Sequence, residues 1–362
     1  MGILYLLHLI GLIWTTNMDF AGLDLGIKAP LLVFPLIYLF GRPLANTFQV
    51  QRWFVGANAV ALVFCVLRAC YTLVTNLINT HGQPGPSMSG FAMSVPFFSS
   101  DLSFFLHPTY MAMYLTLALL LLLRYEVHGP WPKRLSGVIG FLLLLGIVLC
   151  ASKAGWALLF VAGIGLLAER WHDRAMRRMV MWGLLAALTA GVALYAGTDY
   201  VHERVDQVVH TFREDAPSDQ AANSTDDRRL VWKAATELVA LHPLLGSGTG
   251  DVKDELLRVY AERGYVEPLR KQLNAHDQYL NTAVALGIGT ALILLLMILV
   301  PTVSAFRKRD LIMAYFLLLN ALNWTVESML EVQAGVLFFA FFAWLLAMKG
   351  SPSSPPRTSS AP

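Results

Sequence analysis

The sequence has few charged residues. Asp, Glu, Lys and Arg make up only 14% of its 362 residues, whereas 56% are hydrophobic and the mean hydropathy is +0.56. A soluble domain typically has about 25% charged residues. We therefore expect most of the chain to be surrounded by lipid. The formal net charge of +3 is small and the basic residues form no single patch, which argues against nucleic-acid binding.

Cysteines and metal-binding motifs are also scarce. The three cysteines, Cys65, Cys70 and Cys150, all fall in apolar runs, so they do not fit a secreted disulfide framework. The sequence contains no His-Glu-x-x-His, Cys-x-x-Cys or Asp-x-Asp motif. We therefore expect neither a metal nor a cofactor. The first residues lack the basic region and cleavage site of a signal peptide, so the first segment is predicted to be a retained helix.

Apolar runs of about the length needed to cross a bilayer recur along the chain. About ten are found, at 1–16, 27–40, 53–78, 104–123, 135–152, 154–169, 179–197, 277–300, 310–327 and 332–348. They predict an all-α fold, a polytopic membrane helix bundle of about ten transmembrane helices. The bundle is expected to carry one long, partly helical periplasmic loop.

The positions of Lys and Arg predict how the bundle is oriented. If the N-terminus is cytoplasmic, the inner loops hold clusters such as Arg174, Arg177 and Arg178, and the short outer loops hold almost none. Residues 1–197 would then contain about seven spans, 198–276 a periplasmic loop and 277–349 about three further spans. The Ser- and Pro-rich residues 350–362 are predicted to be a disordered cytoplasmic tail.

The long loop contains signals for two helices. Ser224 is followed three residues later by Asp227, a helix-start pattern, and apolar residues then recur at helical spacing as far as Leu241. A second helix is predicted over 251–263, ending before Gly264. The glycine-rich run 246–250 between them has the composition of a phosphate cradle, but without a preceding strand a turn is the favoured interpretation.

Several ionisable residues lie in or beside the outer halves of the predicted spans. A charged side chain at the bilayer centre costs about 2.5 to 3.5 kcal/mol, so an ionisable residue at that depth is expected to have a specific role. They are Arg68, His107, Lys153, His276, Glu327 and Glu331. Each alone is compatible with a side chain that snorkels to the interface, but together they favour a water-accessible cavity on the outer side. We expect Arg68 to pair with the two glutamates there.

Cations dominate the ionisable residues assigned to this cavity. Arg68, Lys153 and the loop pair Arg228 and Arg229 are suited to bind an anion such as phosphate, because guanidinium groups form bidentate bonds to phosphate oxygens. Arg228 also falls near the start of the first predicted loop helix, where free backbone amides favour anions. The alternative for Arg228 is an ordinary solvated side chain.

Several short motifs together resemble the bacterial O-antigen ligase and polymerase superfamily. The stretch Ala275-His276-Asp277-Gln278-Tyr279-Leu280, followed by Gly287-Ile288-Gly289, is similar to its histidine motif. Other landmarks appear in order over residues 105–345. They are His107-Pro108-Thr109-Tyr110, Ser152-Lys153-Ala154-Gly155, and Arg228 with Trp232 ahead of His242-Pro243-Leu244-Leu245-Gly246-Ser247-Gly248.

The resemblance implies a metal-independent glycosyltransferase of the GT-C type in the bacterial inner membrane. Such an enzyme takes a glycan from undecaprenyl pyrophosphate on the periplasmic face and inverts the anomeric centre. By position, His276 would be catalytic, and Lys153 and Arg228 would hold the pyrophosphate. Arg68 is added as a further pyrophosphate ligand because it is one of the cations assigned to the cavity. Supporting roles are assigned to His107, Tyr110, Tyr279, Glu327 and Glu331.

The sequence departs from the family pattern in two places. Lys153 stands where the family usually has arginine, which keeps the charge and loses the bidentate geometry. Family members commonly have about twelve spans, whereas Met1 already falls inside the first apolar run, as though two N-terminal helices were absent.

Three functions remain open at this point. The first is an O-antigen ligase, which moves the glycan onto lipid A-core. The second is an O-antigen or exopolysaccharide polymerase, which uses the same donor and a second lipid-linked glycan as acceptor. The third, and the least favoured, is a transporter of an anionic substrate, because neither inverted repeats nor broken midplane helices are evident.

Overall fold

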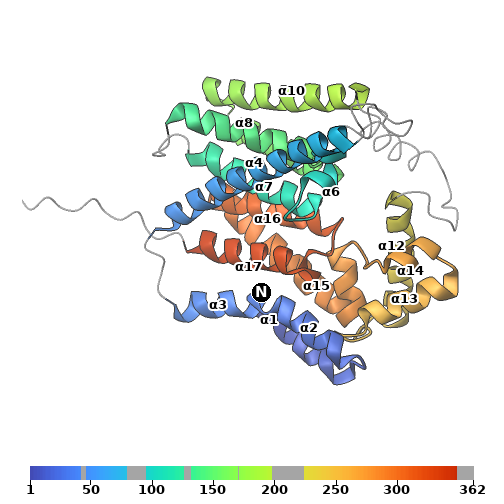
Figure 1. Cartoon of the computed structure of the whole chain (residues 1–362). Coiled ribbons are helices and arrows are strands. Elements are labelled where there is room, and N and C mark those ends of the chain that lie inside the picture. Colours follow the sequence, from blue (N-terminus) through green and yellow to red (C-terminus); the bar gives the residue numbers. More distant parts are fainter. Residues whose placement is uncertain (42–45, 80–94, 126–131, 170, 198–223, 349–362) are drawn as a thin grey trace, which may run out of the picture.

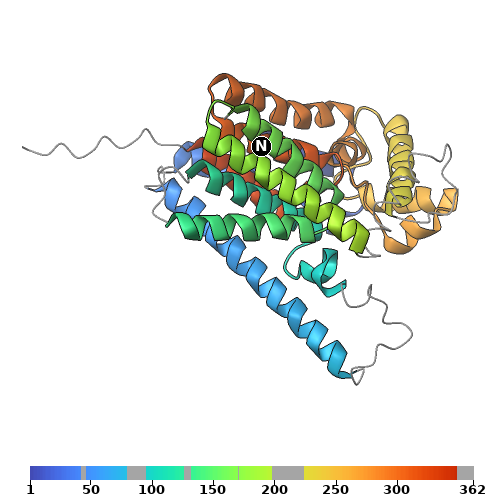
Figure 2. The same cartoon turned by 90° about the horizontal axis from the view of Figure 1, so that it is seen from above.

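The computed structural model describes residues 1–41, 46–79, 95–125, 132–169, 171–197 and 224–348, and these contain helices and no β-strand (Figures 1 and 2). The all-α prediction is therefore confirmed for that part of the chain. The predicted tail 350–362 lies outside the described residues. So does the first part of the predicted loop, residues 198–223.

The helices follow the predicted apolar runs closely. The N-terminal part contains α1 (Gly2–Ile10), η1 (Gly11–Trp14), α2 (Met18–Lys28), α3 (Pro30–Phe40) and α4 (Thr47–Asn79). The middle part contains η2 (Val95–Phe97), α6 (Ser99–Leu102), α7 (Pro108–Tyr125), α8 (Lys133–Leu149), α9 (Lys153–Glu169) and α10 (Arg174–Gly197). The last part contains α12 (Ser224–Leu241), α13 (Val252–Arg263), α14 (Val266–Lys271), α15 (Gln278–Arg307), α16 (Leu311–Trp324), η3 (Met329–Glu331) and α17 (Gln333–Ala347).

Within the described residues, three helical stretches are long and apolar enough to cross a membrane, namely Met18–Phe40, Thr47–Ile78 and Gln278–Arg307. Shorter apolar helices are found at Gly2–Trp14, Pro108–Arg124, Leu311–Trp324 and Gln333–Ala347. The total of about ten spans stays a prediction. The second predicted span was placed too late, because the apolar stretch begins at Met18 and not at residue 27. Asp24 and Lys28 interrupt the apolar pattern in the sequence, but in the fold they form an ion pair with each other.

The helices pack around two hydrophobic cores. The larger joins α4, α7, α8, α15, α16 and α17 and contains the fully buried Phe316 and Phe339. The smaller joins the loop helices α12 and α13 to the start of α15 through residues such as Leu238, Val259 and Val284. Figure 1 shows α12, α13 and α14 together at one end of the bundle. The loop helices therefore form a folded layer beside the start of α15.

The boundaries of the loop helices agree with the sequence signals. Helix α12 begins at Ser224 and ends at Leu241, as predicted. Helix α13 ends before Gly264, which has the left-handed conformation (φ 69°) that glycine adopts without strain. Asp251 occupies the N-cap position of α13, but its side chain accepts no hydrogen bond from an amide of that helix. Its carboxylate accepts hydrogen bonds from the backbone amides of Thr16 (2.8 Å) and Asn17 (2.7 Å), which ties the N-terminal turn to the loop layer.

The glycine-rich run 246–250 is a packing element. Its Ser247 and Gly248 amides donate to carbonyl oxygens of α15 (2.8 and 2.9 Å), and the Gly250 amide donates to Thr15 (3.4 Å). Helix α15 breaks at Gly287, where φ is 82° and a Cβ would lie 2.2 Å from a backbone oxygen of the loop. Since these amides already have protein partners, the run is unsuited to cradle a phosphate, and the interpretation as a turn is correct.

Candidate active site

A cavity of about 290 Å³ opens where the loop helices meet the bundle. Its lining comes from six separate segments of the chain: α6, the starts of α7, α9 and α12, the residues before α15, and the turn between α16 and α17. The structure brings five of the predicted site residues together here, namely His107, Lys153, Arg228, His276 and Glu327. Residues more than 200 positions apart in the sequence thus line one cavity.

Helix N-termini converge on the cavity. First-turn residues of α7 (Pro108 and Thr109) and of α9 (Lys153 and Ala154) line it, and Asp227 in the first turn of α12 does so as well. A helix N-terminus carries a partial positive charge and unpaired amides, and both attract anions. The electrostatics of the cavity therefore favour an anionic ligand even before its cationic side chains are counted.

The start of α9 fixes the position of Lys153. The Ser152 hydroxyl accepts a hydrogen bond from the Gly155 amide (3.2 Å), the usual interaction of an N-cap. A Cβ at Gly155 would lie 2.5 Å from the Cβ of Ala112, so only glycine permits α9 to approach α7 this closely. The Ser-Lys-Ala-Gly motif thus caps a helix and places its lysine at the cavity wall.

His276 lies in a strained turn just before α15. Its φ of 46° belongs to the left-handed region, which is costly for a residue with a Cβ. Two interactions hold this turn in place. The His276 amide donates to Asn274 Oδ1 (2.9 Å), and the Asp277 carboxylate caps α15 by accepting from the Leu280 amide (2.7 Å). The motif around His276 thereby projects an imidazole from the end of a rigid helix.

Glu327 orients the imidazole of His276. Its Oε2 lies 3.1 Å from His276 Nδ1, in the turn after α16. Burial acts to raise the Glu327 pKa, but the hydrogen bond from His276 and the positive charge of Arg228 outweigh it and hold the pKa below its usual value. A carboxylate beside Nδ1 accepts a hydrogen bond from Nδ1–H, so it favours the tautomer whose lone pair is on Nε2. No described residue forms a hydrogen bond with Nε2, so this nitrogen can serve as a base.

Two of the cations in the cavity, Arg228 and Lys271, form ion pairs with acidic side chains. Arg228 Nη2 donates to Glu327 Oε1 (2.8 Å), so one carboxylate contacts both the arginine and the histidine. Lys271 Nζ donates to Asp227 Oδ2 (2.7 Å), and this hydrogen bond raises the Lys271 pKa. Lys271 and Asp227 were not predicted as site residues. The only sequence signal for Lys271 is its position five residues before His276.

Arg68 was predicted to belong to this site, and the structure places it elsewhere. Its guanidinium lies 5.1 Å above the ring of Phe104, and it does not line the cavity. The expected pairing of Arg68 with Glu327 and Glu331 is wrong for the described residues, since these carboxylates contact other cations. Phe104 follows α6, which packs beside α4.

The other predicted supporting residues lie around the cavity. Tyr110 is buried with its ring edge-on to that of His107, at 6.2 Å between centroids. The Tyr279 hydroxyl donates to the carbonyl oxygen of Ala321 (3.4 Å), and its ring packs against Trp324. Neither tyrosine lines the cavity. Both therefore pack the elements that carry the site.

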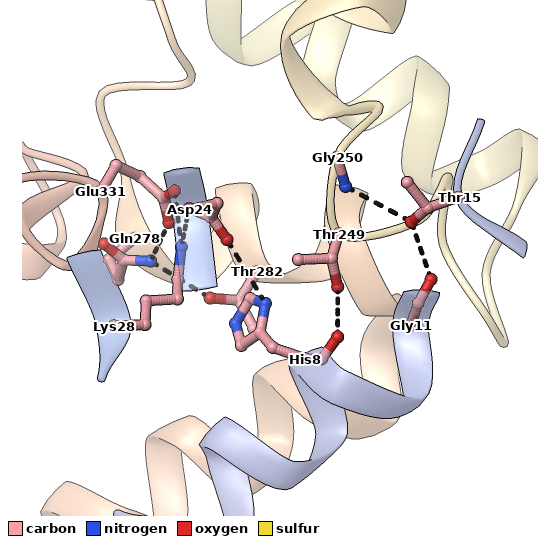
Figure 3. Close-up of polar contacts among 10 residues, drawn as sticks. All are labelled: His8, Gly11, Thr15, Asp24, Lys28, Thr249, Gly250, Gln278, Thr282 and Glu331. Atoms are coloured by element: carbon pink, nitrogen blue, oxygen red, sulfur yellow. Dashed lines mark hydrogen bonds and ion pairs between the residues drawn. The ribbon is translucent and has the colours of Figure 1, made fainter. Parts of the chain in front are cut away.

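Glu331 belongs to a second polar cluster, drawn in Figure 3. Lys28 Nζ donates to Glu331 Oε2 (2.7 Å) and also to Asp24, and Gln278 Nε2 donates to Glu331 Oε1 (3.1 Å). Burial acts to raise the Glu331 pKa, but the charge of Lys28 outweighs it and lowers the pKa to about 2. The i,i+4 spacing of Asp24 and Lys28 was the only sequence signal for this cluster.

Part of the chain matches a known protein family. Residues 138–295 match the model of a family described as O-antigen ligase. The matched segment contains Lys153, Arg228, Lys271 and His276, whereas Glu327 follows it. No curated protein sequence matches the chain. The family comprises glycosyltransferase-like enzymes of the ligase and polymerase type that act on lipid-linked glycans. The match supports membership of this chain in the O-antigen ligase superfamily.

Proposed function

We propose that the protein is an O-antigen ligase-type glycosyltransferase that moves a glycan from undecaprenyl pyrophosphate to lipid A-core. The observation that carries the proposal is the contact between His276 Nδ1 and Glu327 inside a cavity that also holds three cationic side chains, Lys153, Arg228 and Lys271. A base and an anion-binding wall in one cavity are what such a transfer needs.

The proposed chemistry is a single in-line displacement. His276 Nε2 takes the proton of an acceptor hydroxyl, the hydroxyl oxygen bonds to the anomeric carbon of the donor, and the bond from that carbon to the pyrophosphate oxygen breaks. The leaving group is undecaprenyl pyrophosphate, whose added negative charge the three cations and the helix N-termini stabilise. Glu327 stabilises the imidazolium formed at His276. The displacement inverts the anomeric centre.

The cavity is proposed to face the periplasm, with the loop helices α12, α13 and α14 on the same side. In support, the ends of α7 and α9 away from the cavity meet through an ion pair between Arg124 and Glu169. Other basic residues, such as Arg307 and Lys308, also lie at that opposite end. The positive-inside rule assigns such an end to the cytoplasm.

A polymerase is the alternative function, because it would use the same donor and the same base. The experiment that separates the two is complementation of a strain that lacks its own ligase or its own polymerase, read from the lipopolysaccharide profile. A ligase restores long O-antigen chains on lipid A-core in the ligase-deficient strain. Restoration only in the polymerase-deficient strain, from single-repeat to long chains, would assign the polymerase function. Failure in both strains, with normal amounts of protein, would contradict the proposal.

A further inference from the structure

A second cavity of about 240 Å³ lies beside the candidate active site. The segment 271–276 separates the two. Lys271, Leu273 and His276 of this segment line the first cavity. Gln272 and Asn274, at the positions between them, line the second cavity. The rest of its wall comes from α1, α2, α13, the start of α15 and Glu331. Figure 3 shows four of these residues, His8, Asp24, Lys28 and Glu331.

Buried polar atoms without hydrogen-bond partners line this second cavity. They are Nδ1 of His8, Oδ2 of Asp24 and Oδ1 of Asn281, on side chains of residues that are only 2%, 4% and 3% exposed. His8 Nδ1 lies 3.8 Å from Asp24 Oδ2, which is too far for a hydrogen bond. A buried polar atom without a partner is costly, so a site with three of them is suited to a polar ligand.

The charges around the cavity define the class of ligand. An added cation would meet the ammonium of Lys28, which is buried and bonded to both Asp24 and Glu331. An added anion would meet the carboxylates of Asp24 and Glu331. Because Lys253 also lines the cavity, its two cations balance these two carboxylates and the lining favours neither sign of charge. A neutral molecule with several hydroxyl groups avoids both, because each hydroxyl can donate to an oxygen of Asp24 or Asn281 and can also accept a hydrogen bond. The ring of Phe20 adds an apolar surface to the wall.

We propose that the second cavity binds one neutral sugar unit that does not itself react. The Asn274 side chain lines this cavity and accepts the His276 amide hydrogen bond, so an occupant would lie directly behind the turn that carries the base. The source of the sugar rests on the proposed function. It is either a unit of the donor glycan or a unit of the acceptor, and both contain neutral sugars.

The first test measures binding without catalysis. The full-length protein in nanodiscs is examined by saturation-transfer NMR with the methyl glycosides of glucose, galactose, mannose and N-acetylglucosamine as probes. At least one glycoside should show saturation transfer that is lost in Asn281→Leu. The signal should remain in Asn320→Leu, which changes an equally buried asparagine on α16 that does not line the cavity. Absence of transfer for all four probes, or transfer that survives in Asn281→Leu, would overturn the proposal.

The second test identifies the source of the sugar. In a transfer assay, Asn281→Leu should raise the KM for one substrate on the order of tenfold, for the acceptor or for the lipid-linked donor, with little change in kcat. An unchanged KM for both substrates would contradict the proposal even if a glycoside binds. If the proposed glycosyltransferase function is wrong and the sugar site is right, the wild-type protein will bind the glycoside and catalyse no transfer.

Discussion

Glu327 Oε2 lies 3.1 Å from His276 Nδ1, and its other oxygen lies 2.8 Å from Arg228 Nη2. One carboxylate therefore orients the proposed base and positions a proposed phosphate ligand. Glu327 reaches both residues because three elements line the same cavity. They are the turn between α16 and α17, which carries Glu327, the start of α12, which carries Arg228, and the residues before α15, which include His276.

Replacing Glu327 by glutamine tests this orientation. The side-chain amide in Glu327→Gln can donate a hydrogen bond to Nδ1. This favours the tautomer with the proton on Nε2, and a protonated Nε2 cannot act as the base. We expect turnover to fall on the order of 10²-fold or more, by analogy with removal of the aspartate charge in a catalytic triad. Turnover per folded molecule is the measurement. The control is Glu169→Gln, which removes a carboxylate paired with Arg124 at the opposite end of the bundle. Equal activity of Glu327→Gln and wild type would exclude the orienting role.

The cations are expected to contribute to donor binding. Lys153→Ala, Arg228→Ala and Lys271→Ala should each weaken binding of the lipid pyrophosphate donor by about 1.5 to 3 kcal/mol, because each removes a charge-assisted hydrogen bond. Donor affinity of the purified protein is the measurement. Arg68→Met is the matched control, since Arg68 lies over Phe104 outside the cavity. A larger loss of donor affinity in Arg68→Met than in the cavity variants would contradict the assignment.

Lys28 is expected to be essential for stability. Lys28→Met would leave the carboxylates of Asp24 and Glu331 buried without their cation, which costs about 3 to 5 kcal/mol. Arg263→Met is the control, because Arg263 pairs with Glu237 on the surface, where water screens an ion pair and its removal changes stability little. Thermal unfolding in detergent compares the two variants. Similar melting temperatures would show that the Lys28 cluster does not stabilise the fold.

The same cluster predicts a pH dependence. The pKa of Glu331 is lowered from 4.5 to about 2 in the folded protein, so folding favours its ionised form. Its contribution to the free energy of unfolding is fully present above pH 4.5 and is lost as the pH falls from there through about 2. Unfolding midpoints measured across this range should decrease more steeply for wild type than for Glu331→Gln. Parallel curves would contradict the lowered pKa.

The proposed orientation in the membrane can be tested by cysteine labelling. A variant without native cysteines is needed, because Cys70 is exposed. A cysteine at Glu262 on α13 should react with an impermeant reagent added to the periplasmic side, and one at Asp173 should react only after the membrane is permeabilised. The reverse pattern would place the cavity on the cytoplasmic side and contradict the proposed donor.

Local signals in the sequence were sufficient for many helix boundaries. The start of α12 at Ser224 and the end of α13 before Gly264 follow from patterns that span only a few residues. The gathering of His107, Lys153, Arg228, His276 and Glu327 was also predictable in outline. Each lies near an end of a predicted span or loop helix, and the predicted alternation of the spans places all these ends on one side.

The contacts made in three dimensions were not predictable. Arg68 packs over Phe104 and does not line the cavity, and no short sequence pattern predicts that contact. The ion pair of Lys28 with Glu331 joins residues 303 positions apart. Their pairing depends on how the N-terminal turn docks on the loop layer through Asp251, and no short pattern encodes that arrangement.

His276 carries the central claim, and one variant tests it most directly. If Nε2 is the base, His276→Ala should lower turnover by about 10²- to 10⁴-fold while donor affinity stays nearly unchanged, because the base acts on the acceptor proton in the transition state. If His276 only completes the turn before α15, the variant should have a lower yield or melting temperature and a normal turnover per folded molecule. Turnover and donor affinity should be measured on the same purified sample. A large loss of turnover with intact donor affinity is the predicted result, and normal turnover per folded molecule would contradict the catalytic role.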